Sequence, residues 1–318
     1  MEHRALGTSG IDVSRVILGC GNFGGIGSAP AFFGQGETRE QAFAILDAAW
    51  EAGITTFDSA DAYGGGRSEA WLGEWLSGKG SAVRDRIVLT TKTFNPMEAG
   101  GDSGLAPSRV RRQIESSLDR LGVERIDLYL AHDIDPATPV AETIGVFEEL
   151  RVEGTIGAYG GSNVDVAWLD EALRHGRPAW VQNSYSLLDR GDEAGVLPLC
   201  AREGLGFTPF SPLAGGWLTG KYRADAEAPP GSRMALRPEP YLALRTESVW
   251  TALDGLRALA AERETSMATI AFAWLLAQPQ VGAVVVGPRR PEHLQPALEA
   301  VSLRLTPSEA EAIGALFA

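Results

Sequence analysis

The sequence predicts an α/β fold in which eight parallel strands and their helices close into a (β/α)8 TIM barrel, one domain over residues 1–318. Short apolar runs alternate with amphipathic segments about eight times along the chain. Strands that alternate with helices pair in parallel through right-handed crossovers, and eight such units close into a barrel. We also expect an N-terminal hairpin and an extra C-terminal helix.

Each predicted strand is a short apolar run, ended by a polar residue or a glycine. The runs IVLTT at 87–91 and AVVV at 283–286 are typical of strands that are buried on both faces. The predicted strands are 16–18, 55–58, 87–91, 126–131, 156–161, 180–184, 205–210 and 283–286.

Each predicted helix begins or ends at a recognisable signal. Thr38 and Gln41 have the spacing of a capping box, and Gly122 follows the helix at 108–121. Thr138 and Asn163 each precede a helix, so we expect both to be N-caps. The predicted helices are 38–52, 68–76, 108–121, 139–154, 164–175, 195–203 and 291–300.

Three segments fall outside this repeat. Residues 1–15 predict a hairpin with GTSG near its turn, and TPSE predicts a capped helix over 306–317. Residues 212–246 are rich in glycine and proline and are too long for a simple connection, which predicts a segment that covers a ligand.

An open dinucleotide-binding sheet is the competing fold, because GCGNFG at 19–24 matches the pattern GxGxxG after a strand. In that fold the glycines open a helix whose N–H groups bind a pyrophosphate. Here GIGSAP follows and favours a loop, so we interpret the match as accidental.

The composition favours a cytoplasmic protein that acts on a small molecule. The net charge of −13 argues against a nucleic-acid surface. Cys20 and Cys200 form no CxxC motif, and the four histidines lack zinc-ligand spacing, so we predict reduced cysteines and no metal. The sequence contains no run of 18 apolar residues, so we predict no membrane span. The start, MEHRALGTSG, lacks the apolar stretch of a secretory signal. A monomer and a homo-oligomer both remain open.

Polar residues recur where the predicted strands end, which is the face of a barrel that carries its active site. Asp58 with Tyr63, then Lys92, then His132 follow three successive strands. Singly, each has a structural explanation, such as a strand-end cap, a turn aromatic, a rim lysine or a core histidine. Together they suit carbonyl reduction. An ammonium group held by a carboxylate lowers a tyrosine pKa from about 10, and a histidine orients the carbonyl oxygen.

Two groups of motifs resemble segments of the aldo-keto reductase family. The first contains FDSADAYGGGRSE, IVLTTK and LDRLGVERIDLYLAHDID, and the second contains GGSN, VQNSYSLLDR, FTPFSPLAGGWLTGKY and VVVGPRRPEHL. The resemblance extends over nearly the whole chain. It implies an NADP-dependent enzyme that reduces aldehydes or ketones reversibly with NADPH. It also implies that Tyr63 is the general acid, that Lys92 held by Asp58 lowers its pKa, and that His132 orients the carbonyl.

The same resemblance implies how the chain holds its cofactor. Ser162, Asn163 and Gln182 would hold the nicotinamide carboxamide, and Phe210 would stack on its ring in place of a common tyrosine. The other implied cofactor residues are Leu213, Gly215 and Lys221 at the pyrophosphate, Arg289 at the 2′-phosphate, and Gly21, Asn22, Phe23, Ser211, Gly287 and His293.

Three positions depart from the family pattern. His293 stands where many members carry Gln or Arg, and Ala297 stands where many carry an adenine-contacting Asn. Asn22 replaces a common Thr. The strength of the NADPH preference over NADH therefore stays open.

Aromatic residues on loops predict the substrate pocket. Phe23, Phe94 and Trp217, with Phe32 and Phe33, could ring the opening, although each could equally serve loop packing. The leading function is carbonyl reduction. A cofactor-sensing regulatory subunit with slow or no turnover is the alternative, and a metal-dependent barrel hydrolase is disfavoured because ligands are lacking.

Overall fold

The barrel is formed by eight strands that all pair in parallel with their neighbours, in a computed structural model that describes residues 1–318. In chain order they are β3 (Val16–Gly19), β4 (Thr56–Asp58), β5 (Val88–Thr93), β6 (Ile126–Ala131), β7 (Ile156–Ser162), β8 (Trp180–Gln182), β9 (Gly206–Phe207) and β10 (Val284–Val286). A bridge between Phe207 and Val281 and a 2.9 Å hydrogen bond from the Val285 N–H to the Pro209 carbonyl join β9 to β10. The predicted (β/α)8 barrel is confirmed.

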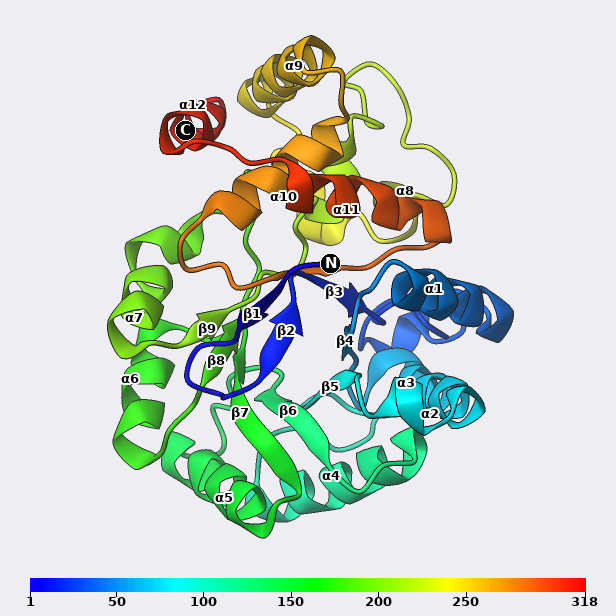
Figure 1. Cartoon of the computed structure of the whole chain (residues 1–318), viewed down its shortest axis with the longest axis vertical. Helices are drawn as coiled ribbons and strands as arrows, with labels where there is room; N and C mark the ends of the chain where they lie inside the picture. Colours follow the sequence, from blue (N-terminus) through cyan, green and yellow to red (C-terminus); the bar gives the residue numbers. More distant parts are fainter.

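Helices surround the strands on the outside (Figure 1). They are α1 (Arg39–Glu51), α2 (Arg67–Lys79), α3 (Ser81–Arg84), α4 (Pro107–Leu121), α5 (Val140–Glu153), α6 (Val166–His175), α7 (Val196–Glu203), α8 (Arg233–Leu236), α9 (Glu247–Glu262), α10 (Met267–Ala277), α11 (Gln295–Ser302) and α12 (Pro307–Ala315). The sequence pattern did not predict α9 or α10. The reason for α10 is that residues around its whole circumference are buried, so it lacks an amphipathic period.

Of the predicted N-terminal caps, two are confirmed and two are wrong. Thr38 and Thr306 both form capping boxes, and α12 confirms the extra C-terminal helix. Thr138 does not cap α5, because Pro139 holds the N-cap position. Asp165 caps α6 instead of Asn163 by accepting a 2.8 Å hydrogen bond from the Trp168 N–H. The Asn163 side chain therefore makes its hydrogen bonds at the mouth of the barrel and not at the start of α6.

The hairpin closes the amino-terminal end of the barrel. Strands β1 (His3–Ala5) and β2 (Asp12–Ser14) pair antiparallel and cross the centre of the view in Figure 1. Leu6 and Val13 from this hairpin are fully buried in the cluster that fills the barrel, together with Leu128 and Trp180. A ligand can therefore enter only from the opposite end, where the strands finish.

The GxGxxG match opens no α-helix, which removes the dinucleotide-sheet alternative. Gly24 adopts φ 70°, and only a short 3₁₀ turn, Pro30–Phe32, follows it. The long segment 212–246 is also short of regular structure, with two 3₁₀ turns, Ala214–Thr219 and Glu239–Leu244, on either side of α8.

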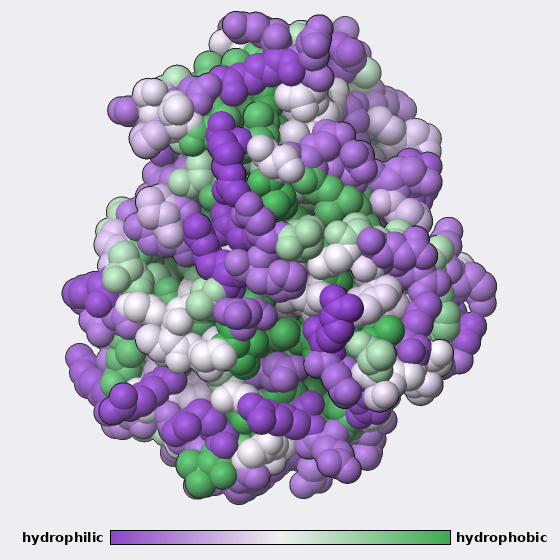
Figure 2. Space-filling model, viewed as in Figure 1, coloured by the Kyte–Doolittle hydropathy of each residue, from purple (hydrophilic) through white to green (hydrophobic).

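The hairpin face is mostly polar. Figure 2 shows hydrophilic side chains spread over it, with apolar areas at several separate places. None of the helices combines the length and the apolar character that a bilayer crossing requires.

Candidate active site

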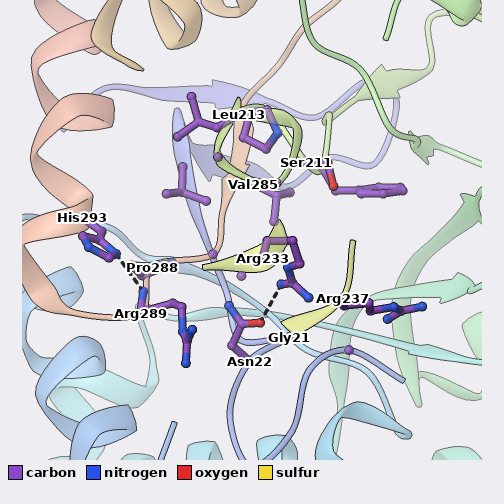
Figure 3. A pocket seen from close by; sticks show the side chains of 18 of the residues that line it. Gly21, Asn22, Ser211, Leu213, Arg233, Arg237, Val285, Pro288, Arg289 and His293 are labelled. Carbon is purple, nitrogen blue, oxygen red and sulfur yellow. Dashed lines mark hydrogen bonds between the residues drawn. The ribbon is translucent and has the colours of Figure 1, made fainter. Parts of the chain in front are cut away.

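One cavity of about 1360 Å³ lies at the carboxyl ends of the barrel strands. Part of its wall is drawn in Figure 3. Asp58, Tyr63 and His132 line it, as does every predicted cofactor residue except Phe23. The remaining lining residues come mainly from the long segment 212–246 and from the loops after β3 and β10. Residues predicted from separate motifs are thus brought into one space.

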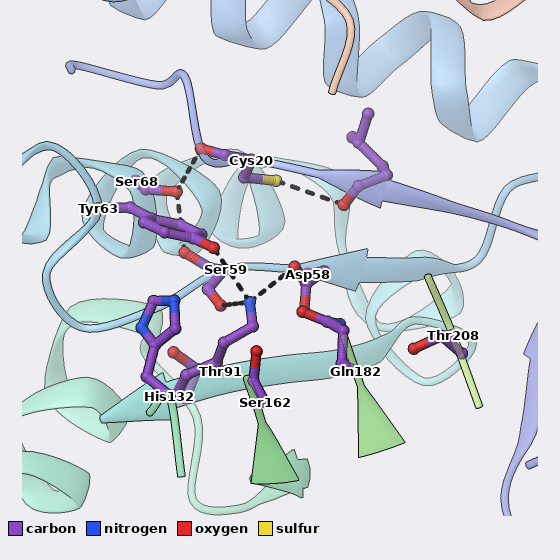
Figure 4. Close-up of polar contacts among 12 residues, drawn as sticks. Cys20, Asp58, Ser59, Tyr63, Ser68, Thr91, His132, Ser162, Gln182 and Thr208 are labelled. Carbon is purple, nitrogen blue, oxygen red and sulfur yellow. Dashed lines mark hydrogen bonds and ion pairs between the residues drawn. The ribbon is translucent and has the colours of Figure 1, made fainter. Parts of the chain in front are cut away.

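A buried ion pair forms the base of this cavity. The Lys92 ammonium donates hydrogen bonds to Asp58 Oδ2 and to the Ser59 carbonyl, both at 2.7 Å, and lies 3.4 Å from the Tyr63 hydroxyl. Lys92 is fully buried and Asp58 nearly so. Burial alone would lower the pKa of Lys92, but Asp58 and Tyr63 beside it raise this pKa above its ordinary value. Lys92 therefore stays charged. Figure 4 labels its three partners, Asp58, Ser59 and Tyr63, and marks their contacts with dashed lines.

Local geometry explains why these side chains converge. Asp58 ends β4 and Lys92 lies near the end of the adjacent strand β5, so both point toward the same barrel mouth. Tyr63 begins a turn in which the next three residues, all glycines, have positive φ. A Cβ on Gly64 would lie 2.5 Å from the Phe23 carbonyl oxygen, so only glycine fits this turn.

His132 completes the group as a neutral imidazole. Burial and the nearby Lys92 charge lower its pKa well below the usual range. Its ring lies edge-on to Tyr63, with 5.4 Å between the centroids. The Asn95 amide nitrogen lies 3.2 Å from His132 Nδ1. An amide nitrogen can only donate, so Nδ1 accepts and the ring proton resides on Nε2, ready to donate to a ligand oxygen.

The pKa of Tyr63 differs in direction from the sequence prediction. Lys92 does act to lower it, as expected, but burial is the larger effect and Asp58 adds to it, so the pKa rises above its ordinary value. The hydroxyl is therefore protonated at neutral pH, which is the state that a general acid needs.

The predicted carboxamide residues are close together, but one of them has a second partner. The Gln182 amide nitrogen donates to Asp58 Oδ1 at 3.1 Å, so its carbonyl oxygen is the group left for a ligand. Asn163 has φ 55° and donates to the His132 carbonyl at 2.8 Å and to Ser162 Oγ at 3.3 Å. Phe210 lines the cavity near these groups and is partly exposed.

Basic side chains gather on the cavity wall. Lys221 and Arg289 occupy it as predicted, and Arg233, Arg237 and Arg290 add to them. Burial lowers the pKa of Lys221, and the positive charges of Arg289 and Arg233 lower it further. Figure 3 shows the Arg233 side chain reaching Asn22, where the two form a 3.1 Å hydrogen bond. Such a wall suits a polyanionic ligand.

The predicted aromatic substrate pocket is not present. Phe23 and Trp217 are 1% exposed and do not line the cavity. Trp217 packs on Trp250 at 4.8 Å between ring centroids, and Phe94 packs against the core. Large apolar side chains next to loops bury themselves in the core because doing so removes more surface from water. The wall beside His132 is instead polar, with Asn95 and Asp133.

The sequence reasoning missed several residues of the site. Arg233 and Arg237 lie in the segment 212–246, so their charge within a long loop was the available signal. Asn95 lies two residues after β5, so its place in a strand-end loop was a signal for it. Glu37 follows no strand end, and only the folded chain places it at the cavity.

The structure offers no metal centre or reactive thiol. No three His, Cys, Asp or Glu side chains are grouped to hold a metal ion. Cys20 and Cys200 are unpaired and buried, and burial raises the pKa of both thiols, that of Cys200 to about 12.

The chain is similar to known proteins over almost its full length. A family model described as the aldo/keto reductase family matches residues 15–317. An Escherichia coli NADH-specific methylglyoxal reductase is 32% identical, covering 98% of this chain and 96% of its own length. A probable voltage-gated potassium channel subunit beta from Oryza sativa subsp. japonica is also 32% identical, with 99% and 96% covered. The structure of a glycerol dehydrogenase from Gluconobacter oxydans superimposes with a TM-score of 0.83 at 26% identity, covering 99% of this chain and 94% of that one.

Proposed function

Because this chain belongs to the aldo/keto reductase family, we propose that it transfers a hydride reversibly between a nicotinamide dinucleotide, NADPH, and the carbonyl group of an aldehyde or ketone. The chain is an oxidoreductase of a family that uses nicotinamide cofactors and acts on small carbonyl compounds. The observation that supports the finer statement is the contact of Asp58, Lys92 and Tyr63 beside His132, at the wall of one cavity.

In this proposal each of the four side chains has a separate task. His132 donates from Nε2 to the substrate oxygen and holds it near Tyr63. Tyr63 gives its proton to that oxygen as negative charge develops there. Lys92 stabilises the phenolate that results, and Asp58 keeps the ammonium group in place. When bound, the nicotinamide supplies or accepts the hydride.

The cavity fits a dinucleotide together with a small substrate. Its volume exceeds the range of about 300–1,000 Å³ that is usual for small-molecule pockets. Ser162, Asn163 and the Gln182 carbonyl would hold the carboxamide, and Phe210 would stack on the nicotinamide ring. At Gly215 the Tyr241 ring packs directly against the backbone, and a Cβ there would lie only 2.5 Å from that ring.

The phosphates would lie along the basic wall. The backbone of Leu213 and Gly215, with Lys221, would meet the pyrophosphate, and Arg289 would meet the 2′-phosphate of NADPH. In the same proposal residues 1–318 act as one domain in the cytoplasm, where both cysteines stay reduced.

The alternative is a regulatory subunit that senses the cofactor with little turnover. One 32% identical relative carries the name of a potassium channel subunit, which is the observation in its favour. The complete Asp58, Tyr63, Lys92 and His132 group favours catalysis.

A substrate panel decides between the two functions. Purified protein is mixed with NADPH and two matched sets of carbonyl compounds, one hydroxylated and one apolar and aromatic, and nucleotide absorbance is followed. We expect turnover, faster with the polar set because Asn95 and Asp133 line the wall beside His132. Tight nucleotide binding with no turnover on either set would favour the regulatory subunit.

A further inference from the structure

Glu37 is a buried carboxylate on the cavity wall, and Arg289 already binds it. The Arg289 Nε donates to Glu37 Oε1 at 2.5 Å, and the Glu37 side chain is 2% exposed against 39% for Arg289. Arg289 Nη1 donates to the Gly231 carbonyl at 2.6 Å. Two of the nitrogens that could bind a phosphate are thus occupied by the protein itself.

The backbone holds Glu37 at this place. Its N–H donates to the Asn22 carbonyl at 2.9 Å, and its own carbonyl accepts from the Gly24 N–H at 3.1 Å. These bonds tie the residue to the loop after β3, directly before the capped start of α1. These bonds fix the backbone of Glu37 beside the cavity, and its side chain is buried there against Arg289.

We propose that Glu37 sets the choice of dinucleotide by neutralising Arg289, so that NADH binds about as well as NADPH. This inference rests on the proposed function, because it concerns the same nucleotide site. A 2′-phosphate carries nearly two negative charges, and placing it on Arg289 brings it next to the Glu37 carboxylate. The repulsion offsets much of the attraction that the arginine provides.

The second carboxylate oxygen of Glu37, Oε2, also supports binding of NADH. Glu37 Oε2 is buried and has no hydrogen-bond partner, although the residue lines the cavity. A ribose 2′-hydroxyl can donate to such an oxygen, and a phosphate cannot. Glu37 therefore strengthens the binding of NADH while it weakens the binding of NADPH, which brings the two affinities together.

The test is a titration of protein fluorescence with NADPH and with NADH, which measures binding without any carbonyl substrate. For the wild type we expect the two dissociation constants to agree within about threefold. Glu37→Gln keeps the size and an acceptor for Arg289 but removes the charge. We expect it to tighten NADPH about tenfold, since one charge interaction in a partly exposed site is of this size. We expect it to weaken NADH about threefold, since an amide nitrogen replaces the oxygen that accepts from the ribose hydroxyl.

Two further variants make the result specific. Glu292→Gln removes a carboxylate from an exposed position on the same wall, and we expect it to change the NADPH-to-NADH ratio less than twofold. In an Arg289→Ala background, Glu37→Gln should tighten NADPH less than it does in the wild type, because the arginine no longer holds the phosphate beside Glu37.

Three results would overturn the inference: weaker NADPH binding in Glu37→Gln, an unchanged ratio, or an equal rise in Glu292→Gln. Weaker binding would mean that Glu37 orients Arg289 toward the phosphate. If the nucleotides bind as expected but no carbonyl turns over, the reductase function fails and the role of Glu37 stands. If turnover is normal and the ratio does not move, only the role of Glu37 fails.

Discussion

At the scale of single residues, the chemistry depends on the proton of Tyr63. Its hydroxyl lies 3.4 Å from the Lys92 ammonium, and the residue lines the cavity, whereas Lys92 itself is fully buried. Lys92 therefore acts on a ligand through its neighbours, and Asp58 holds both Lys92 and Gln182 in place.

Replacing Tyr63 by Phe tests this dependence. We expect kcat for carbonyl reduction to fall by about 100-fold or more, since a positioned acid contributes 10² to 10⁴. The dissociation constant for the nucleotide, measured by fluorescence, should stay within about twofold of the wild-type value. A variant that binds nucleotide poorly would show instead that Tyr63 shapes the nucleotide site.

The pH dependence of the two reaction directions tests the protonation state of Tyr63. Burial raises the pKa of Tyr63 above its ordinary value, so the hydroxyl stays protonated through the neutral and mildly alkaline range. Carbonyl reduction, which needs the protonated form, should therefore have a level kcat/KM from pH about 7 to 9. Alcohol oxidation needs the phenolate and should keep rising over the same range. A reduction rate that falls with a midpoint below pH 8 would mean that Lys92 outweighs burial.

At the scale of elements, loops rather than strands determine the nucleotide wall. The strands supply Asp58, Lys92, Ser162 and Gln182 from fixed positions in the barrel. The segment 212–246 and the loops after β3 and β10 supply the rest. Positive φ at Ser211, just before that segment, and at Ala214, Gly215 and Gly216 near its start gives this wall an unusual backbone conformation.

Gly215→Ala tests whether this conformation matters for binding. Gly215 has φ 65°, and an added Cβ would lie 2.5 Å from the Tyr241 ring, so the loop must shift. We expect nucleotide affinity to fall about tenfold or more, measured by the same titration. Gly204→Ala is the matched control, because Gly204 has φ 69°, its added Cβ meets only a side-chain methyl at 3.5 Å, and it lies outside the cavity wall. Equal losses in both variants would argue against a role of the loop in binding.

At the scale of the whole molecule, a buried polar network connects the site to the outer helices. Asp61 is fully buried and accepts a 2.7 Å hydrogen bond from Thr93 Oγ1. Arg109, on α4, also donates to Thr93 Oγ1, at 2.9 Å. Burial, with the charge of Glu69 nearby, raises the pKa of Asp61 to about 7.

This raised pKa predicts how stability changes with pH. Between pH about 4 and 7 the folded chain keeps the Asp61 proton and the unfolded chain loses it, so the folded state binds more protons. The contribution of Asp61 to the free energy of unfolding therefore falls as pH rises through this window. Asp61→Asn should gain stability relative to the wild type between pH 5 and pH 8, measured by urea unfolding. A difference that does not change with pH would contradict the assigned pKa.

Patterns along the chain were sufficient for the barrel, the hairpin and the C-terminal helix. Periodicity, capping boxes and terminal glycines act over a few residues, so they can be recognised in the sequence without knowing the fold. The same locality made Asp58, Lys92, Ser162 and Gln182 predictable, because each lies at the end of a strand. The aromatic pocket was wrong, because whether Phe23 and Trp217 face the core or a ligand depends on neighbours far away in the chain.

The sequence by itself thus determined the family, the barrel and the four residues at its mouth, because local patterns and strand ends specify them. Only the tertiary structure decided which charges meet. Glu37 and Arg289 are 252 positions apart, yet they form one ion pair. Burial likewise decided the direction in which the pKa of Tyr63 shifts. Charge effects depend on distance and solvent exposure in space, and local sequence patterns reveal neither of them.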